Sequence, residues 1–227
     1  MNRCVFFRSV IPVITIIASA VVPRGIHAQQ SVATGGTGGR DALRYVIIQA
    51  GTGVTVPLMH LGASDDIDDG YARPHTMLIF RAYIPFMRKI DLMVDLALPR
   101  FKVDEQKYEK NTRTLIDEAF YKGKILSLGA RWFPFANPFK RGFVMASAGM
   151  YQLIWDRFLN GGRDIYTVIN GAYKLGGAVG GGLEFKLGDV MMDGVLRYHH
   201  YMDACNFGEG NLSWLEIGLQ VTFGGRL

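Results

Sequence analysis

The 227-residue chain contains little cysteine and, beyond its first residues, no long apolar run. Its two cysteines, Cys4 and Cys205, exclude a disulfide-rich scaffold and a cysteine-rich zinc module. No stretch after residue 28 approaches about 18 consecutive apolar residues, the length that indicates a membrane-spanning helix. These absences exclude a bundle of transmembrane helices and a small disulfide-stapled fold.

Charge of either sign is also modest, because only 20% of the residues are charged and 49% are hydrophobic. This composition excludes wholesale disorder. The net charge is +5, but Arg3, Arg8 and Arg24 lie in an acid-free leader, which leaves 22 basic against 20 acidic residues. No strongly basic region remains outside the leader, so nucleic acid is not an expected partner.

Residues 1–28 are predicted to be a secretory signal peptide that is cleaved near Ala28. Basic residues precede an apolar run from Val10 to Val22, and a small residue stands before the cut. That run includes Pro12 and is shorter than the ~20 residues of a membrane anchor, which is the competing interpretation. Residues 29–42 are rich in Gly, Ser and Thr and are predicted to form a flexible lead-in.

Polar and apolar residues then alternate with a period of two in eight segments, the pattern of β-strands. Strands that cross a bilayer at a tilt need about 9–11 residues, and these segments are long enough. In one of them Leu92 and Val94 share a face, while Asp91 and Asp95 share the other. We predict strands at 44–58, 76–86, 89–100, 122–134, 142–155, 172–186, 189–201 and 213–224.

One face of these strands is almost free of charge, and the other carries the charges and most of the strand glycines. The interior of an eight-stranded barrel is just wide enough for side chains, so glycine there relieves crowding. An arginine facing lipid at the midplane costs about 2–4 kcal/mol, which favours an inward charged face. Because unpaired buried charge is unfavourable, we expect ion pairs that plug the lumen and leave at most a low-conductance pathway. The predicted lumen charge network comprises Arg81, Arg131, Lys174, Lys186, Arg197, Asp91, Asp95, Glu184, Asp193 and Glu216.

The connections between the predicted strands alternate between long and short. Bacterial outer-membrane barrels have an even strand number, long external loops and short periplasmic turns. We therefore predict an all-β protein in the cell outer membrane, with an eight-stranded antiparallel up-and-down transmembrane β-barrel at 43–225 after the signal peptide. The long connections are 59–75, 101–121, 156–171 and 202–212, and the shorter ones are 87–88, 135–141 and 187–188.

The last predicted strand carries the most specific motif. Glu216, Gly218, Val221 and Phe223 match the terminal-strand pattern of a polar residue, a glycine, an apolar residue and an aromatic residue. Over about 43–224 the chain resembles the small outer-membrane β-barrel superfamily of OmpA-, OmpX- and OmpW-like domains. This resemblance implies that outer-membrane lipids and the outer-membrane assembly machinery are partners. The chain departs from the family because Gly224–Leu227 follows the aromatic residue.

His199 and His200 are the one feature that suggests an enzyme. Outer-membrane lipid A deacylases are similar barrels that carry a serine two residues after a histidine. Tyr201 and Met202 occupy those positions here, and the next serine is Ser213, so the resemblance implies at most an inactive relative. Adjacent histidines on a strand point to opposite faces and cannot easily share a metal. We expect no catalytic residue, no metal site and no cofactor.

Two polar connections admit more than one interpretation. Residues 64–70 contain spaced acids that could bind Ca²⁺, but the twelve-residue calcium-loop pattern is absent, which favours a solvated loop. Residues 104–119 could form a short surface helix or extend a strand.

We expect an integral outer-membrane protein without enzymatic activity that serves envelope integrity, surface interaction or limited passage of small solutes. A surface partner would bind the long connections, where function resides in such folds. The alternatives are an outer-membrane lipid-modifying enzyme that resembles the lipid A deacylases and a soluble periplasmic barrel.

The assignment of faces makes a direct prediction. Val94→Arg places a charge on the face assigned to lipid and should block membrane insertion. Ala97→Ser changes the opposite face of the same strand and should have a mild effect. The recovery of each variant in the outer-membrane fraction measures this difference, and equal tolerance of both would contradict the assignment.

Overall fold

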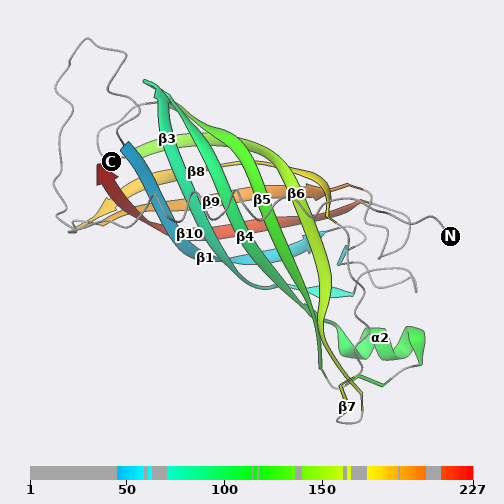
Figure 1. Cartoon of the computed structure of the whole chain (residues 1–227). Coiled ribbons are helices and arrows are strands. Elements are labelled where there is room, and N and C mark those ends of the chain that lie inside the picture. Colours follow the sequence, from blue (N-terminus) through cyan, green and yellow to red (C-terminus); the bar gives the residue numbers. More distant parts are fainter. Residues whose placement is uncertain are drawn as a thin grey trace. The chain divides into compact units, whose positions relative to one another are not determined.

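Eight long antiparallel strands close into a barrel (Figure 1). Each long strand pairs with the next one along the chain, and the last pairs with the first, so the ring has no free edge. The strands are β1 (Tyr45–Leu58), β3 (His75–Met87), β4 (Ile90–Val103), β5 (Glu118–Phe135), β6 (Lys140–Asn160), β8 (Lys174–Leu187), β9 (Val190–Tyr201) and β10 (Leu212–Arg226).

Three short elements lie at the end of the barrel that carries the long connections. The two-residue strands β2 (Ala72–Arg73) and β7 (Arg163–Asp164) extend the pairing of β4 and β6, respectively. The helix α2 (Glu105–Thr112) follows β4 directly, and the Asp104 side chain caps it by accepting a hydrogen bond from the Lys107 backbone N–H.

This computed structural model describes residues 45–58, 61–62, 71–113, 115–116, 118–135, 140–160, 163–164, 173–188, 190–202 and 211–226. The predicted signal peptide (1–28), the lead-in (29–42), the acidic segment 64–70 and Cys205 lie outside these residues. Among the described residues, no helix combines the length and the apolar character needed to cross a bilayer.

The strand order, the antiparallel pairing and the closure predicted from the sequence are confirmed. The prediction of a polar loop at 101–121 was wrong at both ends, because β4 continues to Val103 and β5 begins at Glu118. Likewise, β6 runs to Asn160, inside the predicted loop 156–171, and it begins at Lys140, inside the predicted turn 135–141. Backbone pairing of β5 with β4 and β6, and of the first residues of β6 with β8, sustains these extensions, and the hydrophobic alternation does not report it.

The sequence analysis left two alternatives for residues 104–119, a short helix and an extension of a strand. The structure contains both. Helix α2 takes the first part and β5 takes the last residues. The Glu109 side chain accepts a hydrogen bond from the Ile116 backbone N–H, which ties the end of α2 to the chain that returns toward β5.

Outside the register shifts at Pro85/Met87 and Phe120/Tyr121, side chains alternate between the two faces of the barrel wall. On β4, Asp91, Met93 and Asp95 are buried inside, while Leu92 and Leu96 are exposed outside. The same alternation places Arg131 and Arg197 inside, where each is at most 1% exposed. The outward face presents large apolar side chains on all eight strands, as the sequence analysis expected.

Inward glycines allow neighbouring strands to pack closely. Gly149 on β6 faces Ser127 on β5, and a Cβ at this position would lie 2.2 Å from the Leu126 carbonyl oxygen. The outward Gly142 on the same strand has open space, since an added Cβ would come no nearer than 3.8 Å to the Leu183 side chain. Glycine is therefore required by packing at the first position and not at the second.

Gly149→Ala should lower the stability of the barrel by about 1–3 kcal/mol, because backbone atoms must shift to admit the methyl group. Gly142→Ala is the matched control and should be neutral. Urea unfolding of the refolded variants measures both, and similar midpoints would contradict the close packing described here.

Candidate functional site

The lumen is filled by side chains in three zones along the barrel axis. A cluster of buried apolar and aromatic side chains fills the end that carries the long connections, and we call it the mouth cluster. A second cluster, the turn-end cluster, lies toward the short turns and comprises Tyr83, Met93, Phe133, Phe143, Met145 and Val195. The charged belt lies between the two clusters, and some of its residues lie among theirs. It comprises Arg81, Asp91, Asp95, Arg131, Glu184, Asp193, Arg197 and Glu216. The mouth cluster comprises Leu61, Tyr71, Ala72, Met77, Ile79, Ala97, Phe101, Val103, Ile116, Ala119, Tyr121, Ile125, Tyr151, Leu153, Tyr201, Leu212 and Trp214.

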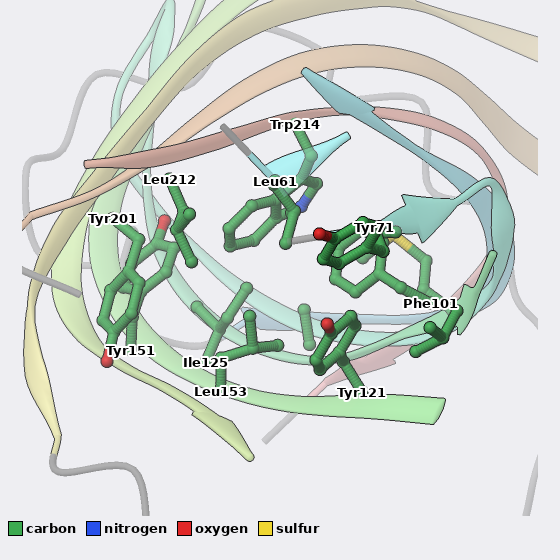
Figure 2. Packing of buried hydrophobic residues seen from close by; sticks show 14 of the residues in the cluster. Leu61, Tyr71, Phe101, Tyr121, Ile125, Tyr151, Leu153, Tyr201, Leu212 and Trp214 are labelled. Atoms are coloured by element: carbon green, nitrogen blue, oxygen red, sulfur yellow. The ribbon is translucent and has the colours of Figure 1, made fainter. Parts of the chain in front are cut away.

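Figure 2 shows how the mouth cluster fills the ring of strands. Side chains from different strands converge on its centre, including Trp214, Phe101 and Tyr121. The rings of Phe101 and Trp214 meet edge to face at 5.7 Å, and those of Tyr151 and Tyr201 stack at 6.2 Å. The barrel is therefore closed by apolar packing at this end.

Contacts between Tyr71 and the segment that contains helix α2 fix both to each other at the rim of the mouth cluster. Tyr71 has a positive φ of 51°, and its carbonyl oxygen accepts a 2.7 Å hydrogen bond from the Asp104 backbone N–H. The Asn111 side chain donates to the Tyr71 hydroxyl at 3.1 Å, and the Tyr108 ring packs edge-on against Tyr71. Partial burial raises the pKa of the Tyr108 phenol.

The half of the charged belt next to the mouth cluster alternates cations and anions. Arg81 bridges Asp95 at 3.0 Å and Glu216 at 2.6 Å. Arg197 contacts the second oxygen of Asp95 at 2.6 Å and donates to the Ser147 hydroxyl. These residues come from β3, β4, β6, β9 and β10, so the network joins opposite walls of the barrel.

His199 links this network to the mouth cluster. Its Nε2 lies 2.9 Å from the Glu216 carboxylate, and its Nδ1 lies 3.2 Å from the Tyr151 hydroxyl. Its ring stacks on Trp214 at 5.1 Å and an interplanar angle of 5°. The histidine thus has a polar edge in the belt and an apolar face in the cluster.

The other half of the belt surrounds Arg131. This guanidinium lies 2.9 Å from both Asp91 and Asp193, and its carbon sits 3.8 Å from the centre of the Tyr83 ring. The Gln49 side chain donates to Asp193 at 2.7 Å. The charge of Arg131 is thus held by two carboxylates and an aromatic face, and the Gln49 amide hydrogen-bonds one of those carboxylates.

The structure places the predicted network residues in two groups. The three arginines and five carboxylates of the prediction lie in the charged belt. Lys186 is exposed and Lys174 is half-buried, because they lie near opposite ends of the barrel where a long side chain can reach water.

Sequence reasoning missed two members of the network. Arg141 contacts Glu184 at 3.1 Å but lies one residue before the predicted start of its strand. Extending the alternation back from Phe143 would have identified it. His199 shares the charged face of its predicted strand with Asp193 and Arg197, but the predicted charge network did not include it.

His200 lies on the outward face and belongs to a different environment. Its Nδ1 is 3.2 Å from the Ser213 hydroxyl across the β9–β10 pair, and that hydroxyl is 2.8 Å from the Tyr198 hydroxyl. A serine therefore does lie beside this histidine. It comes from the neighbouring strand, so the spacing along the sequence did not predict it. Ser213 is 1% exposed, so the hydroxyl is covered. Tyr198 also borders a shallow apolar groove of about 510 Å³ on the outward face of β8–β10.

The residues of the predicted assembly signal lie on both faces of β10. Glu216 and Gly218 face the lumen, where the carboxylate of Glu216 forms part of the charged belt. Phe223 is exposed on the outward face near the end of the strand, opposite Ile48 of β1. Within the described part of the chain, no group of three or more His, Cys, Asp or Glu side chains is arranged to hold a metal ion.

Removing one cation from the belt should be far more damaging than removing one at the surface. Arg81→Met removes a buried cation that bridges Asp95 and Glu216 and leaves these carboxylates with less opposite charge than they need, so it should cost about 3–5 kcal/mol. Arg73→Met, which removes an ion pair to Asp104 from a side chain that is 54% exposed, should cost no more than about 1 kcal/mol.

Urea unfolding of the two variants in the same detergent tests this difference. Equal losses would mean that the belt contributes little to the stability of the barrel.

No protein-family model and no curated protein matches the chain. Among solved structures, the N-terminal barrel domain of OprF from Pseudomonas aeruginosa has a TM-score of 0.42 at 12% identity, covering 80% of this chain and 98% of that one. The outer membrane protein OprG of the same organism has a TM-score of 0.45 at 13% identity, covering 80% and 97%.

Neisserial surface protein A (NspA) superposes with a TM-score of 0.54. The two chains are 15% identical, and the match covers 78% of this chain and 95% of that one. The closed barrel of the described residues thus has a counterpart of known structure. The chain shares its barrel fold with neisserial surface protein A.

Proposed function

We propose that the protein is an integral outer-membrane barrel without enzymatic activity that supports the cell envelope and presents its long connections at the surface. The observation that carries this proposal is the distribution of side chains across the barrel wall. Large apolar residues such as Leu78 and Leu128 are 52% and 66% exposed on the outside, while arginines and carboxylates are buried inside. This is the arrangement that a hydrocarbon environment favours and that water disfavours.

The apolar surface is also continuous around adjacent strands. Phe80 on β3 lies opposite Leu96 on β4, and Leu96 lies opposite Leu126 on β5. A contiguous apolar surface of this kind is rare on soluble monomers and favours association or precipitation in water. It therefore supports the membrane barrel over the soluble periplasmic barrel.

Orientation follows from the lengths of the connections. The turns between β3 and β4 and between β8 and β9 are two residues long, and both barrel termini lie at that end. The segments between β1 and β3, β4 and β5, β6 and β8, and β9 and β10 lie at the opposite end. In outer-membrane barrels the longer connections face the outside, so the mouth cluster and α2 are proposed to face the cell exterior.

The filled lumen favours a structural role over solute passage. The mouth cluster closes one end with apolar side chains, and ion pairs cross the barrel beneath it. A solute would have to displace both layers, each of which is fully buried. We therefore favour envelope integrity and surface interaction, with the assembly machinery recognising β10 during insertion.

The pair formed by His200 and Ser213 is the observation that bears on the lipid-modifying alternative. A nucleophile and a base within hydrogen-bond reach are required for acyl transfer, and this pair meets that distance. However, the serine is covered, and the described hydrogen bonds of His200 go to hydroxyl groups rather than to an orienting carboxylate. The geometry favours a packing role on the outward face.

Cell fractionation and gel mobility test the proposed location. The protein should appear in the outer-membrane fraction and change its mobility on boiling, because the folded barrel resists detergent unfolding. Recovery in the soluble periplasmic fraction would overturn the proposal. In planar bilayers the purified protein should show no stable large conductance, and a persistent open channel would contradict a filled lumen.

A further inference from the structure

The outward faces of β4 and β5 change abruptly from apolar to basic near the long-connection end. On β4 the outward series ends with Leu96 and Leu98 and continues with Arg100 and Lys102. On β5 the corresponding series passes from Leu126 to Lys124 and Lys122. The first two outward positions beyond the apolar surface are therefore basic on both strands. We call Arg100, Lys102, Lys122 and Lys124 the basic patch.

The register places these four residues together. Arg100 lies directly opposite Lys122, and Lys102 and Lys124 each stand one outward position away along the strands. Adjacent strands are about 5 Å apart and alternate residues about 7 Å apart, so the four Cα atoms fall within about 15 Å. Like charges directly opposite on a sheet are unfavourable, which makes this pairing informative.

Described contacts position the patch side chains at the barrel wall. The Arg100 guanidinium lies over the Phe120 ring at 4.1 Å from its centre, and Lys102 contacts Glu105 of α2 at 3.4 Å. Lys122 and Lys124 are exposed. Arginine that rests on an aromatic ring still presents donors at its edge, and the lysines supply point charges.

The positive charge is concentrated on β4, β5 and the short strand β2, whose Arg73 pairs with Lys102 and forms an ion pair with Asp104. At the same level, the outward positions of the flanking strands are Thr76 and Leu78 on β3 and Gln152 and Ile154 on β6. A general preference for charge at the membrane boundary would affect these positions as well. The basic residues therefore cluster on one side of the barrel wall, which favours a localised ligand.

The height of the patch matches the edge of a hydrocarbon layer. From Ile90 to Arg100, ten residues at about 3.3 Å each and a tilt of about 40° rise about 25 Å, the usual height of the apolar band. The patch thus lies where the charged headgroup of a lipid would stand when its chains run along Leu96, Leu98 and Leu126.

We propose that the basic patch binds the phosphate groups of an anionic lipid in the leaflet around the long-connection end. This inference rests on the proposed membrane location. Arginine and lysine are the side chains that recognise phosphate, and each basic residue near a membrane surface adds attraction to anionic lipid. A lipid is favoured over a soluble anion because the charges adjoin an apolar surface that binds the chains.

The experiment compares two double variants that remove the same charge from opposite ends of the barrel. Lys122→Gln with Lys124→Gln alters the patch, and Arg88→Gln with Lys89→Gln alters the turn between β3 and β4. Each protein is refolded into phosphatidylcholine vesicles with or without phosphatidic acid. Native mass spectrometry then counts the lipids retained by the extracted barrel.

The wild type and the turn variant should retain phosphatidic acid in preference to phosphatidylcholine. In the patch variant, the ratio of retained phosphatidic acid to retained phosphatidylcholine should fall at least about tenfold. Unchanged preference in the patch variant, or equal loss in both variants, would overturn the proposal. Excess inorganic phosphate added to phosphatidylcholine vesicles should not raise the thermal stability as phosphatidic acid does, and an equal effect would overturn the assignment to a lipid.

A separate measurement tests the proposed membrane location without the lipid site. Each variant is inserted into pure phosphatidylcholine vesicles, and the gel-mobility shift on boiling then shows whether a folded barrel has formed. A barrel that inserts but shows no preference for phosphatidic acid would remove the lipid site and leave the proposed function intact.

Discussion

The pairing of Arg81 and Arg197 with Asp95 and Glu216 inside the barrel is the interaction on which the rest of the structure depends. Each of these groups is fully buried, and an unpaired charge in such a place would cost several kcal/mol. The pairs form only when β3, β4, β9 and β10 adopt one register, since a shift of one residue would turn every charge outward. The ion pairs therefore specify the barrel as well as fill it.

The packing around the charges follows from the same constraint. Side chains as large as arginine fit in a narrow lumen only where other inward positions are small, and Gly149 and Gly129 provide that space between β5 and β6. Aromatic rings then close the two ends: Trp214 lies against His199, and Tyr83 lies against Arg131. Charged residues, glycines and aromatic residues thus pack together to fill the lumen. A filled lumen favours an envelope and surface role over transport.

The outward face of the barrel determines how the protein meets the surrounding lipid. On the outward face, the change from leucine to Arg100 and Lys124 lies about one apolar-band height, roughly 25 Å, from the short turns. The proposed lipid site therefore adds an observation of local charge to the apolar surface on which the proposed membrane location rests. Helix α2, which is capped by Asp104 and fixed to Tyr71, gives the same end of the barrel a defined structure.

The sequence by itself determined the number of long strands, their order and the face each side chain takes, because a two-residue period and the cost of burying charge in lipid are local properties. It also identified Arg81, Asp95 and Glu216 as lumen residues. Only the tertiary structure decided which cation meets which anion, that Arg141 and His199 join them, that Ser213 lies beside His200, and that β5 and β6 extend beyond the apolar band. These facts depend on register and on contacts between strands far apart in the chain, and alternation along one strand carries no information about its neighbour.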